Sequence, residues 1–141
     1  MGPSNRTETL EAVAGQAGPT VARISRAPKL AETLSRENGC PSQASLGLQV
    51  ISATMVLAGY AEIARKFAFA EERPGAIGNR VRVRRAPVGV CAAVIPWNVP
   101  IFIAAMKLGP ALAAGCSVVL KLAPETPLDG YLLAEAIDEI G

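Results

Sequence analysis

The sequence contains no histidine and few aromatic or charged residues. The absence of histidine excludes Ser-His-Asp and Cys-His catalytic pairs within the chain, and every zinc site that needs imidazole ligands. Of the 141 residues, 18% are charged and 4% are aromatic, and the formal net charge is +2. That excess is too small to indicate a nucleic-acid partner. Because 50% of the residues are hydrophobic, we expect the chain to collapse around an apolar core rather than to be disordered.

Cysteine is also scarce, and Cys40, Cys91 and Cys116 are far apart and form no CxxC pair. This pattern predicts neither a metal site nor a disulfide framework. The first ten residues, MGPSNRTETL, lack the apolar stretch of a secretory signal. We therefore expect a cytoplasmic protein with reduced thiols and no bound metal.

One hydrophobic run is long enough to span a bilayer. No charged residue occurs from Ala86 to Met106, and several arginines precede this run. However, Pro96, Asn98 and Pro100 interrupt its middle and would leave polar groups unpaired in lipid. We expect no membrane insertion.

Helical patterns dominate the first half of the chain after a small, polar leader. A helix is predicted from Pro28 to Asn38, with Gly39 as its left-handed end. A longer helix is predicted from about Ser42 to Ala68, and the segment Glu71–Gly78 is interpreted as a turn-rich link.

Residues 80–84, RVRVR, alternate with a period of two and give the clearest strand signal. Their arginines suit either a phosphate-binding patch or the solvent face of an edge strand. We favour the edge strand, because no aromatic residues are interleaved with the arginines.

The rest of the pattern alternates between strand and helix. Apolar strands are predicted over Val88–Ile95 and Ser117–Leu122, with a helix from Pro100 to about Ala114 between them. A last helix is predicted with Thr126 as its N-cap. Its buried stripe is predicted to consist of Leu128, Leu132, Leu133, Ala136, Ile137 and Ile140.

We expect the two apolar strands to be parallel, which makes a βαβα unit. The predicted fold class is α/β, an incomplete Rossmann-like nucleotide-binding domain preceded by two helices and a β-arm. Because parallel sheets need more strands and cover on both faces, the sequence is interpreted as ending within such a domain. The predicted organisation is a poorly ordered leader (1–24), a helical segment (25–78) and a partial dinucleotide-binding domain (79–141).

Five blocks of sequence then occur in a recognisable order. They are APVGV (86–90), IPWNVP (95–100), KLGPALAAGC (107–116), VVLK (118–121) and PETPL (124–128). Together they strongly resemble the start of the nucleotide-binding domain of aldehyde dehydrogenases. The likeness is dense from Asn79 to Gly141 and looser from Ala27, where the predicted helix ends in Glu-Asn-Gly. The resemblance implies NAD(P)-dependent oxidation of an aldehyde to an acid, through attack by a cysteine thiolate and hydride transfer.

The resemblance also assigns roles to single residues. Asn98 matches the asparagine whose amide donates to the developing oxyanion, whereas by itself it could belong to the N-cap region of the next helix. Lys121 matches the lysine that binds the adenosine ribose, and its simpler interpretation is a lysine at a strand end. Ile95, Pro96 and Trp97 match the segment that lies along the cofactor.

The expected cofactor is NAD, and the use of NADP stays open. The family often has a glutamate three residues after the ribose-binding lysine. Pro124 stands at that position here, and Glu125, the remaining candidate carboxylate, comes one residue later.

Four further residues match positions around the chemistry. Lys107 matches a lysine near the catalytic glutamate with a relay or positioning role, and a surface lysine is the alternative. Val99, Ile103 and Met106 match positions that line the aldehyde tunnel, and plain helix core is their alternative.

The family's nucleophile segment, Gly-Gln-x-Cys, and its general-base segment, Glu-Leu-Gly-Gly, do not occur, and all three cysteines stand in other motifs. We therefore interpret the chain as an N-terminal part of an aldehyde dehydrogenase, truncated before the catalytic cysteine and inactive alone. The alternative is a non-catalytic remnant or a partner-dependent nucleotide-binding fragment. The resemblance implies a small-molecule aldehyde as substrate and a homo-oligomeric parent.

Overall fold

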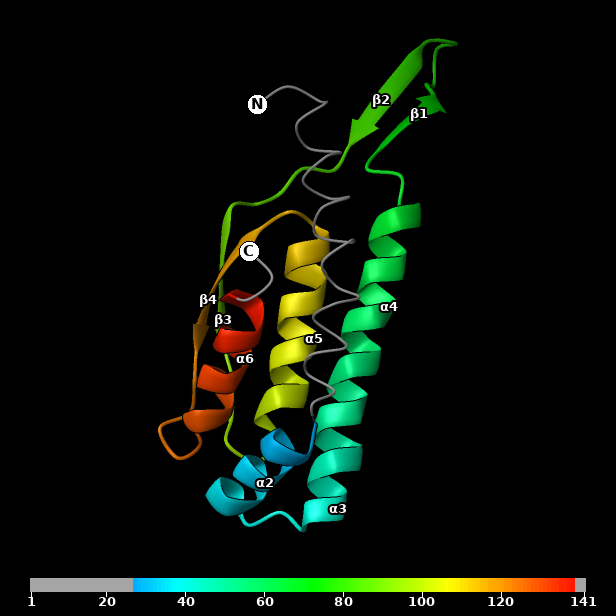
Figure 1. Ribbon diagram of the computed structural model, residues 1–141. Coiled ribbons are helices and arrows are strands. Elements are labelled where there is room, and N and C mark those ends of the chain that lie inside the picture. The colour runs from blue at the N-terminus through cyan, green and yellow to red at the C-terminus, as the bar shows by residue number, and fades with distance from the viewer. Residues whose placement is uncertain (1–26, 139–141) are drawn as a thin grey trace.

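A computed structural model describes residues 27–138, which form a mixed α/β structure with two small sheets. Figure 1 shows the elements in order: α2 (Ala27–Asn38), α3 (Ser42–Ala44), the π-helical segment η1 (Ser45–Ile51), α4 (Ser52–Lys66), β1 (Ala70–Pro74), β2 (Arg80–Arg84), β3 (Val90–Val94), α5 (Pro100–Ala113), β4 (Ser117–Lys121) and α6 (Leu128–Asp138). The predicted leader at 1–24 lies outside the described residues. The predicted α/β class is confirmed at this level.

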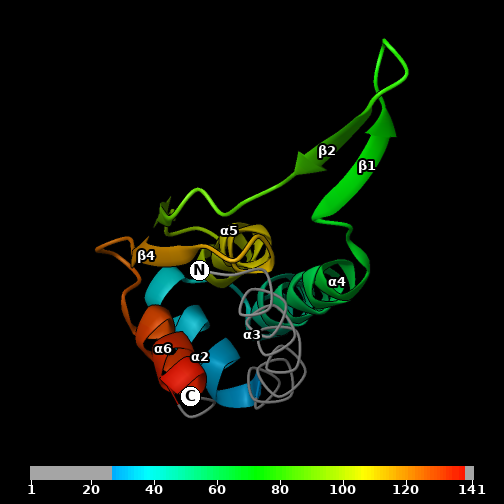
Figure 2. The same ribbon diagram turned by 90° about the horizontal axis from the view of Figure 1, so that it is seen from above.

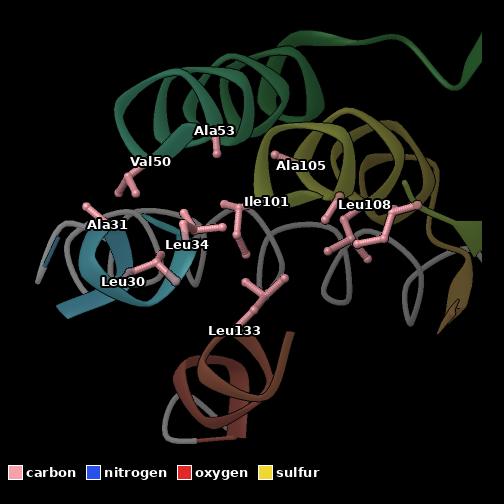
Figure 3. Close-up of a cluster of buried hydrophobic side chains, with 11 residues drawn as sticks. Leu30, Ala31, Leu34, Val50, Ala53, Ile101, Ala105, Leu108 and Leu133 are labelled. Carbon is pink, nitrogen blue, oxygen red and sulfur yellow. The ribbon is translucent and has the colours of Figure 1, made fainter. Parts of the chain in front are cut away.

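The apolar core lies between the helices. Figure 3 shows Leu34 of α2, Ile101 of α5 and Leu133 of α6 pointing toward one another, with Val50 and Ala53 approaching from η1 and α4. The buried cluster consists of Leu30, Ala31, Leu34, Val50, Ala53, Ile95, Ile101, Ala104, Ala105, Leu108 and Leu133. Within this cluster only Ile95, directly after β3, lies outside the helices, so the core belongs chiefly to the helices.

The long helix after α2 runs without a break from Ser42 to Lys66, and thus ends two residues before the predicted end. The left-handed stop at Gly39 (φ +73°) is confirmed. The prediction missed the wider turn of η1, where the Ser52 hydroxyl donates to the carbonyl of Gly47, five residues earlier (3.1 Å). Apolar periodicity does not separate such a π-turn from ordinary helix, because both place similar residues on one face.

By length and composition, the helix Ser42–Lys66 is also long and apolar enough to cross a membrane. Its mean hydropathy over an 18-residue window is 1.4. In the structure this helix packs along α5, and Tyr60 lies against Gly109. The other hydrophobic run, from Ala86 to Met106, is divided into β3, a turn and the first half of α5. That run is therefore no single helix.

β1 and β2 form an antiparallel hairpin that projects away from the helices (Figures 1 and 2). The strand predicted at 80–84 is confirmed, and its arginine side chains are exposed. The turn-rich link predicted over Glu71–Gly78 is wrong for residues 71–74, which belong to β1. Glutamates and a proline give that segment little strand propensity.

Opposite charges across the hairpin account for this strand. Glu72 pairs with Arg80 (3.2 Å), and Glu71 pairs with Arg85 (3.0 Å). The hairpin closes where the backbone N–H of Gly75 donates to the carbonyl of Asn79 (2.7 Å). β1 thus forms because its partner strand is basic, which its own residues do not reveal.

β3 and β4 pair in parallel, as the sequence predicts, with Val90 opposite Ser117 and Val94 opposite Lys121. Both strands are shorter than predicted. Figure 2 shows α5 against one face of this pair. The other face is open, since Val90, Val94 and Val119 are 70%, 55% and 62% exposed. No other part of residues 27–138 covers it.

The start of α6 differs from the prediction. Thr126 is buried, but its hydroxyl has no hydrogen-bond partner within the described part of the chain, so the predicted N-cap is wrong. Instead the backbone N–H groups of Leu128 and Asp129 donate to the two carboxylate oxygens of Glu37 in α2, at 2.9 and 3.3 Å. A residue distant in sequence thus does the capping.

The predicted buried stripe of α6 is confirmed only in part. Leu133 is buried, Leu132 and Ala136 are half-buried, and Leu128 and Ile137 are exposed. Ile140 lies outside the described residues. The exposed leucine and isoleucine follow from the packing of α6, which rests on α2 and α5.

Candidate functional site

The ends of β3 and β4 bring two of the predicted site segments together. The backbone N–H of Ile95 donates to the carbonyl of Lys121 (3.1 Å), so the chain leaving β3 starts beside the last residue of β4. We call residues 95–98 and 121–125 the carboxyl edge. Open α/β sheets bind their ligands outside the carboxyl ends of the strands. The predicted oxyanion and ribose residues therefore share the edge where such a ligand would bind.

Asn98 lies on the short turn between β3 and α5. Its side chain and that of Trp97 are exposed, whereas Ile95 and Pro100 on either side are buried. The N-cap of α5 is Val99, and no side chain caps this helix. Asn98 therefore stands one position before the N-cap without a capping hydrogen bond, and the turn presents its amide at the surface between the buried residues Ile95 and Pro100.

Lys121 and Glu125 are exposed on the segment that leaves β4. Ala123 and Thr126, which alternate with them, are buried and attach this segment to the fold. The lysine ammonium and the carboxylate are thus both available at the carboxyl edge for a polar ligand. These groups suit the ribose and phosphate of a dinucleotide.

The other predicted residues lie along α5. Val99 and Ile103 are half-buried, and Met106 and Lys107 are exposed. From Pro100 to Lys107 the helix rises by roughly 10 Å. The structure therefore does not bring Lys107 next to the carboxyl edge, but places it two turns away along the helix.

Asn38, at the end of α2, is a site residue that the sequence interpretation missed. Its side-chain Nδ2 donates to the carbonyl oxygens of Trp97 (3.4 Å) and Asn98 (3.3 Å). Its Oδ1 accepts from the backbone N–H of Cys40 (3.0 Å). The Glu-Asn-Gly ending of the first helix was a signal for this position, but it did not indicate what the asparagine contacts.

Asp129, beside the carboxyl edge, is fully buried. Its Oδ1 accepts from the backbone N–H of Gly130 (2.6 Å), and its Oδ2 has no partner within residues 27–138. Burial, and to a lesser extent the Glu37 carboxylate, raise the pKa of Asp129 to about 7. A neutral carboxyl group is therefore retained here at pH values where an exposed aspartate is ionised.

Two of the three cysteines lie in or beside the strands, and the third, Cys40, lies next to Asn38. Cys116 is buried, and Cys91 is half-buried within β3. Desolvation, followed by the neighbouring Cys116 thiol, raises the pKa of the Cys91 thiol, which disfavours the reactive thiolate. Among the described residues, no cluster of three His, Cys, Asp or Glu side chains could hold a metal ion.

Residues 4–141 match the aldehyde dehydrogenase family. The chain is 43% identical over 116 residues to a geranial dehydrogenase of Castellaniella defragrans, a match that covers 82% of this chain and 24% of that protein. The chain therefore belongs to the aldehyde dehydrogenase family.

Solved structures agree with this assignment. An NADP-dependent enzyme of E. coli superposes with a TM-score of 0.89 at 32% identity, over 99% of this chain and 29% of that one. The NAD+ complex of an aldehyde dehydrogenase from Bacillus cereus also gives 0.89, at 31% identity, over 100% and 28% of the two chains. The chain spans about a quarter of the length of the relatives that it matches.

Proposed function

We propose that this chain forms the N-terminal quarter of an NAD(P)-dependent aldehyde dehydrogenase and supplies one half of its active site. The observation that carries the proposal is the hydrogen bond between Ile95 N–H and the Lys121 carbonyl (3.1 Å). It places the turn with Asn98 and the segment with Lys121 at one edge of a parallel strand pair, in a chain of this family.

In this proposal Asn98 is the oxyanion donor. Its amide group is neutral, exposed on a short turn, and held between the buried residues Ile95 and Pro100. A donor fixed in this way stabilises negative charge on the aldehyde oxygen as the bond to the nucleophile forms, without having to reorient during the reaction.

Lys121 and Glu125 would hold the cofactor, with Ile95, Pro96 and Trp97 alongside it. NAD(P)+ supplies the hydride acceptor when bound. The exposed Lys121 ammonium suits the ribose hydroxyls, and a carboxylate displaced by one residue, at Glu125, leaves room for the phosphate of NADP. The two relatives above, one NADP-dependent and one solved with NAD+, support either cofactor.

The remaining groups around the aldehyde have smaller roles. Val99, Ile103 and Met106 follow one another on the face of α5 that starts at the Asn98 turn, and they would line the substrate channel. Lys107, two turns along α5, would act from a distance as a positioning residue. The reacting thiolate would come from outside this chain, because Cys91 and Cys116 lie in or beside the strands and Cys40 does not stand in the family's Gly-Gln-x-Cys segment.

The proposal extends to the whole protein. The parent would be a homo-oligomer that acts on a small-molecule aldehyde in the cytoplasm. A partner-dependent nucleotide-binding fragment is the second candidate, and the open outer face of β3 and β4 favours it, since a parallel sheet is stable only when both faces are covered.

A chimeric enzyme tests the proposal. This chain replaces the matching quarter of the geranial dehydrogenase, and NADH formation is followed. Asn98→Ala should lower kcat by about 10²–10³-fold with little change in KM for the cofactor. Lys121→Ala should raise that KM by about tenfold or more, because a hydrogen bond to a charged group is lost. The 141-residue chain alone should oxidise no aldehyde.

Two matched variants serve as controls. Gln43→Ala removes another exposed amide, and Lys29→Ala another exposed lysine, and neither residue belongs to the carboxyl edge. An inactive chimera, or equal effects of Asn98→Ala and Gln43→Ala, would contradict the proposal.

A further inference from the structure

The last two residues of α2 contact the turn after β3 and the first turn of α6. Asn38 donates to the carbonyl oxygens of Trp97 and Asn98, on the turn after β3. Glu37, its neighbour, accepts from the backbone N–H groups of Leu128 and Asp129, in the first turn of α6 after β4. One short stretch of helix thus reaches the turn that carries Asn98 and the helix that follows the segment with Lys121.

The Glu37 contact is a strong one for its type. A carboxylate that accepts from the free N–H groups of a helix N-terminus combines charge-assisted hydrogen bonds with the favourable helix dipole. The local alternative is unused, because the Thr126 hydroxyl makes no hydrogen bond among residues 27–138. The start of α6 is therefore held by a side chain from α2.

The Asn38 contact is equally specific. Its Oδ1 is held by the backbone N–H of Cys40 (3.0 Å), which fixes the side chain and directs Nδ2 toward the turn. The two carbonyl groups that it contacts belong to Trp97 and Asn98, the residue proposed as oxyanion donor. Movement of this turn would move the Asn98 amide directly.

We propose that Glu37 and Asn38 are positioning residues, which together set the distance and orientation between the Asn98 turn and the start of α6, the helix that follows the segment with Lys121 and Glu125. The role of these residues in the active site rests on the proposed function, whereas their contacts do not depend on it. We call the contacts of Glu37 and Asn38 the α2 bracket, because they connect two segments of the chain from outside the strand pair. It holds the turn directly after β3 and the first turn of the helix that follows β4.

Two variants separate the halves of the bracket. Asn38→Asp keeps the oxygen that accepts from Cys40 but loses the donor to Trp97 and Asn98. Glu37→Gln keeps the size of the side chain but loses the carboxylate charge that holds Leu128 and Asp129. Glu32→Gln is the matched control, because Glu32 is exposed on the same helix and pairs with Arg36 along it.

Hydrogen–deuterium exchange of the 141-residue chain, measured by mass spectrometry, follows both turns at once. Asn38→Asp should speed exchange by about tenfold in peptides covering 96–103, and Glu37→Gln by a similar factor in peptides covering 126–132. Trp97 is the only tryptophan, so Asn38→Asp should also shift its fluorescence, while Glu37→Gln and Glu32→Gln should not.

A second measurement, the pKa of Asp129, tests the Glu37 contact alone. Because the Glu37 carboxylate contributes to the raised pKa of Asp129, Glu37→Gln should lower that pKa, and Glu32→Gln should leave it unchanged. An effect on general stability alone would not move this titration.

The inference is overturned if exchange is uniform along the chain, in wild type or in either variant, or if each variant loosens both turns equally. Activity of the chimera is read separately. Local exchange effects in a chimera that shows no activity would refute the proposed function and leave the bracket standing. Normal dependence on Asn98 and Lys121 without local exchange effects would refute the bracket alone.

Discussion

The helical part of the molecule and the β3–β4 pair bury their apolar residues to very different extents. Leu34 of α2 and Ile101 of α5 are 0% and 2% exposed, whereas Val90 of β3 and Val119 of β4 are 70% and 62% exposed. Both parts are rich in aliphatic residues. They differ because an amphipathic helix needs cover along one stripe, whereas a strand of a parallel sheet carries apolar side chains on two faces.

Residues 27–138 thus complete a helical core but leave one face of the β3–β4 pair uncovered. The helices α2, η1, α4, α5 and α6 close a core among themselves (Figure 3). The strand pair obtains cover from α5 on one face only (Figure 2). Stability should therefore reside in the helical part, and the outer sheet face should tolerate change.

The largest expected effect tests this contrast directly. Leu34→Ala should lower the free energy of unfolding by about 2–5 kcal/mol, because it leaves a cavity among α2, α5 and α6. Val119→Ala, on the open face, should cost less than about 1 kcal/mol. Urea unfolding followed by circular dichroism measures both. If the two costs are equal, the outer face is covered in solution, and the contrast fails.

The second effect concerns the junction between α2 and α6. Because the pKa of Asp129 is about 7 in the folded chain and 3.8 in an ordinary aspartate, the unfolded chain releases this proton first as pH rises. The contribution of Asp129 to the free energy of unfolding should thus fall between about pH 4 and 7, by on the order of 2–4 kcal/mol, and stay constant above pH 7.

Asp129→Asn should remove this fall and make the chain more stable than wild type near pH 7, as thermal unfolding across the pH range would reveal. Asp138→Asn changes an exposed carboxylate of the same helix and serves as the control. A fall that persists in Asp129→Asn would show that another group is responsible.

The smallest effects test the closeness of α4 and α5. A Cβ atom at Gly109 would lie 2.5 Å from the Tyr60 ring, so Gly109→Ala should cost about 1–3 kcal/mol. At Gly59, on the exposed side of α4, a Cβ meets nothing within 4 Å. Gly59→Ala should therefore stabilise the chain by up to about 1 kcal/mol. Melting temperatures compare the two, and a neutral Gly109→Ala would show that the helices lie further apart.

Sequence interpretation worked where the cause of a structure is local. The long helices follow from apolar periodicity, and Gly39 and Gly115 end helices with φ of +73° and +77° because glycine adopts the left-handed region freely. The parallel pairing of β3 and β4 followed from two apolar runs joined by a helix.

Interpretation failed where the cause lies elsewhere in the chain. β1 was missed because its glutamates favour a strand only opposite the arginines of β2 and the arginine that follows. The N-cap was assigned to Thr126 because threonine is a common local cap. In the structure the Glu37 carboxylate accepts the hydrogen bonds at this helix end instead.

The candidate site shows the same division. The resemblance to a family singled out Asn98 and Lys121, and the parallel register placed both at one edge. The roles of Asn38 and Glu37 could not be predicted in this way, because no sequence pattern indicates which residues they contact.

By itself, then, the amino-acid sequence determined the helices, the glycine stops, the parallel strand pair and the family. The tertiary structure alone decided which residues hold the two turns of the site. Asn38 contacts a residue 60 positions away, and Glu37 one that is 91 positions away. Such contacts depend on how α2 packs against α6 and the strand ends, and packing is a property of surfaces that assemble only when the chain folds.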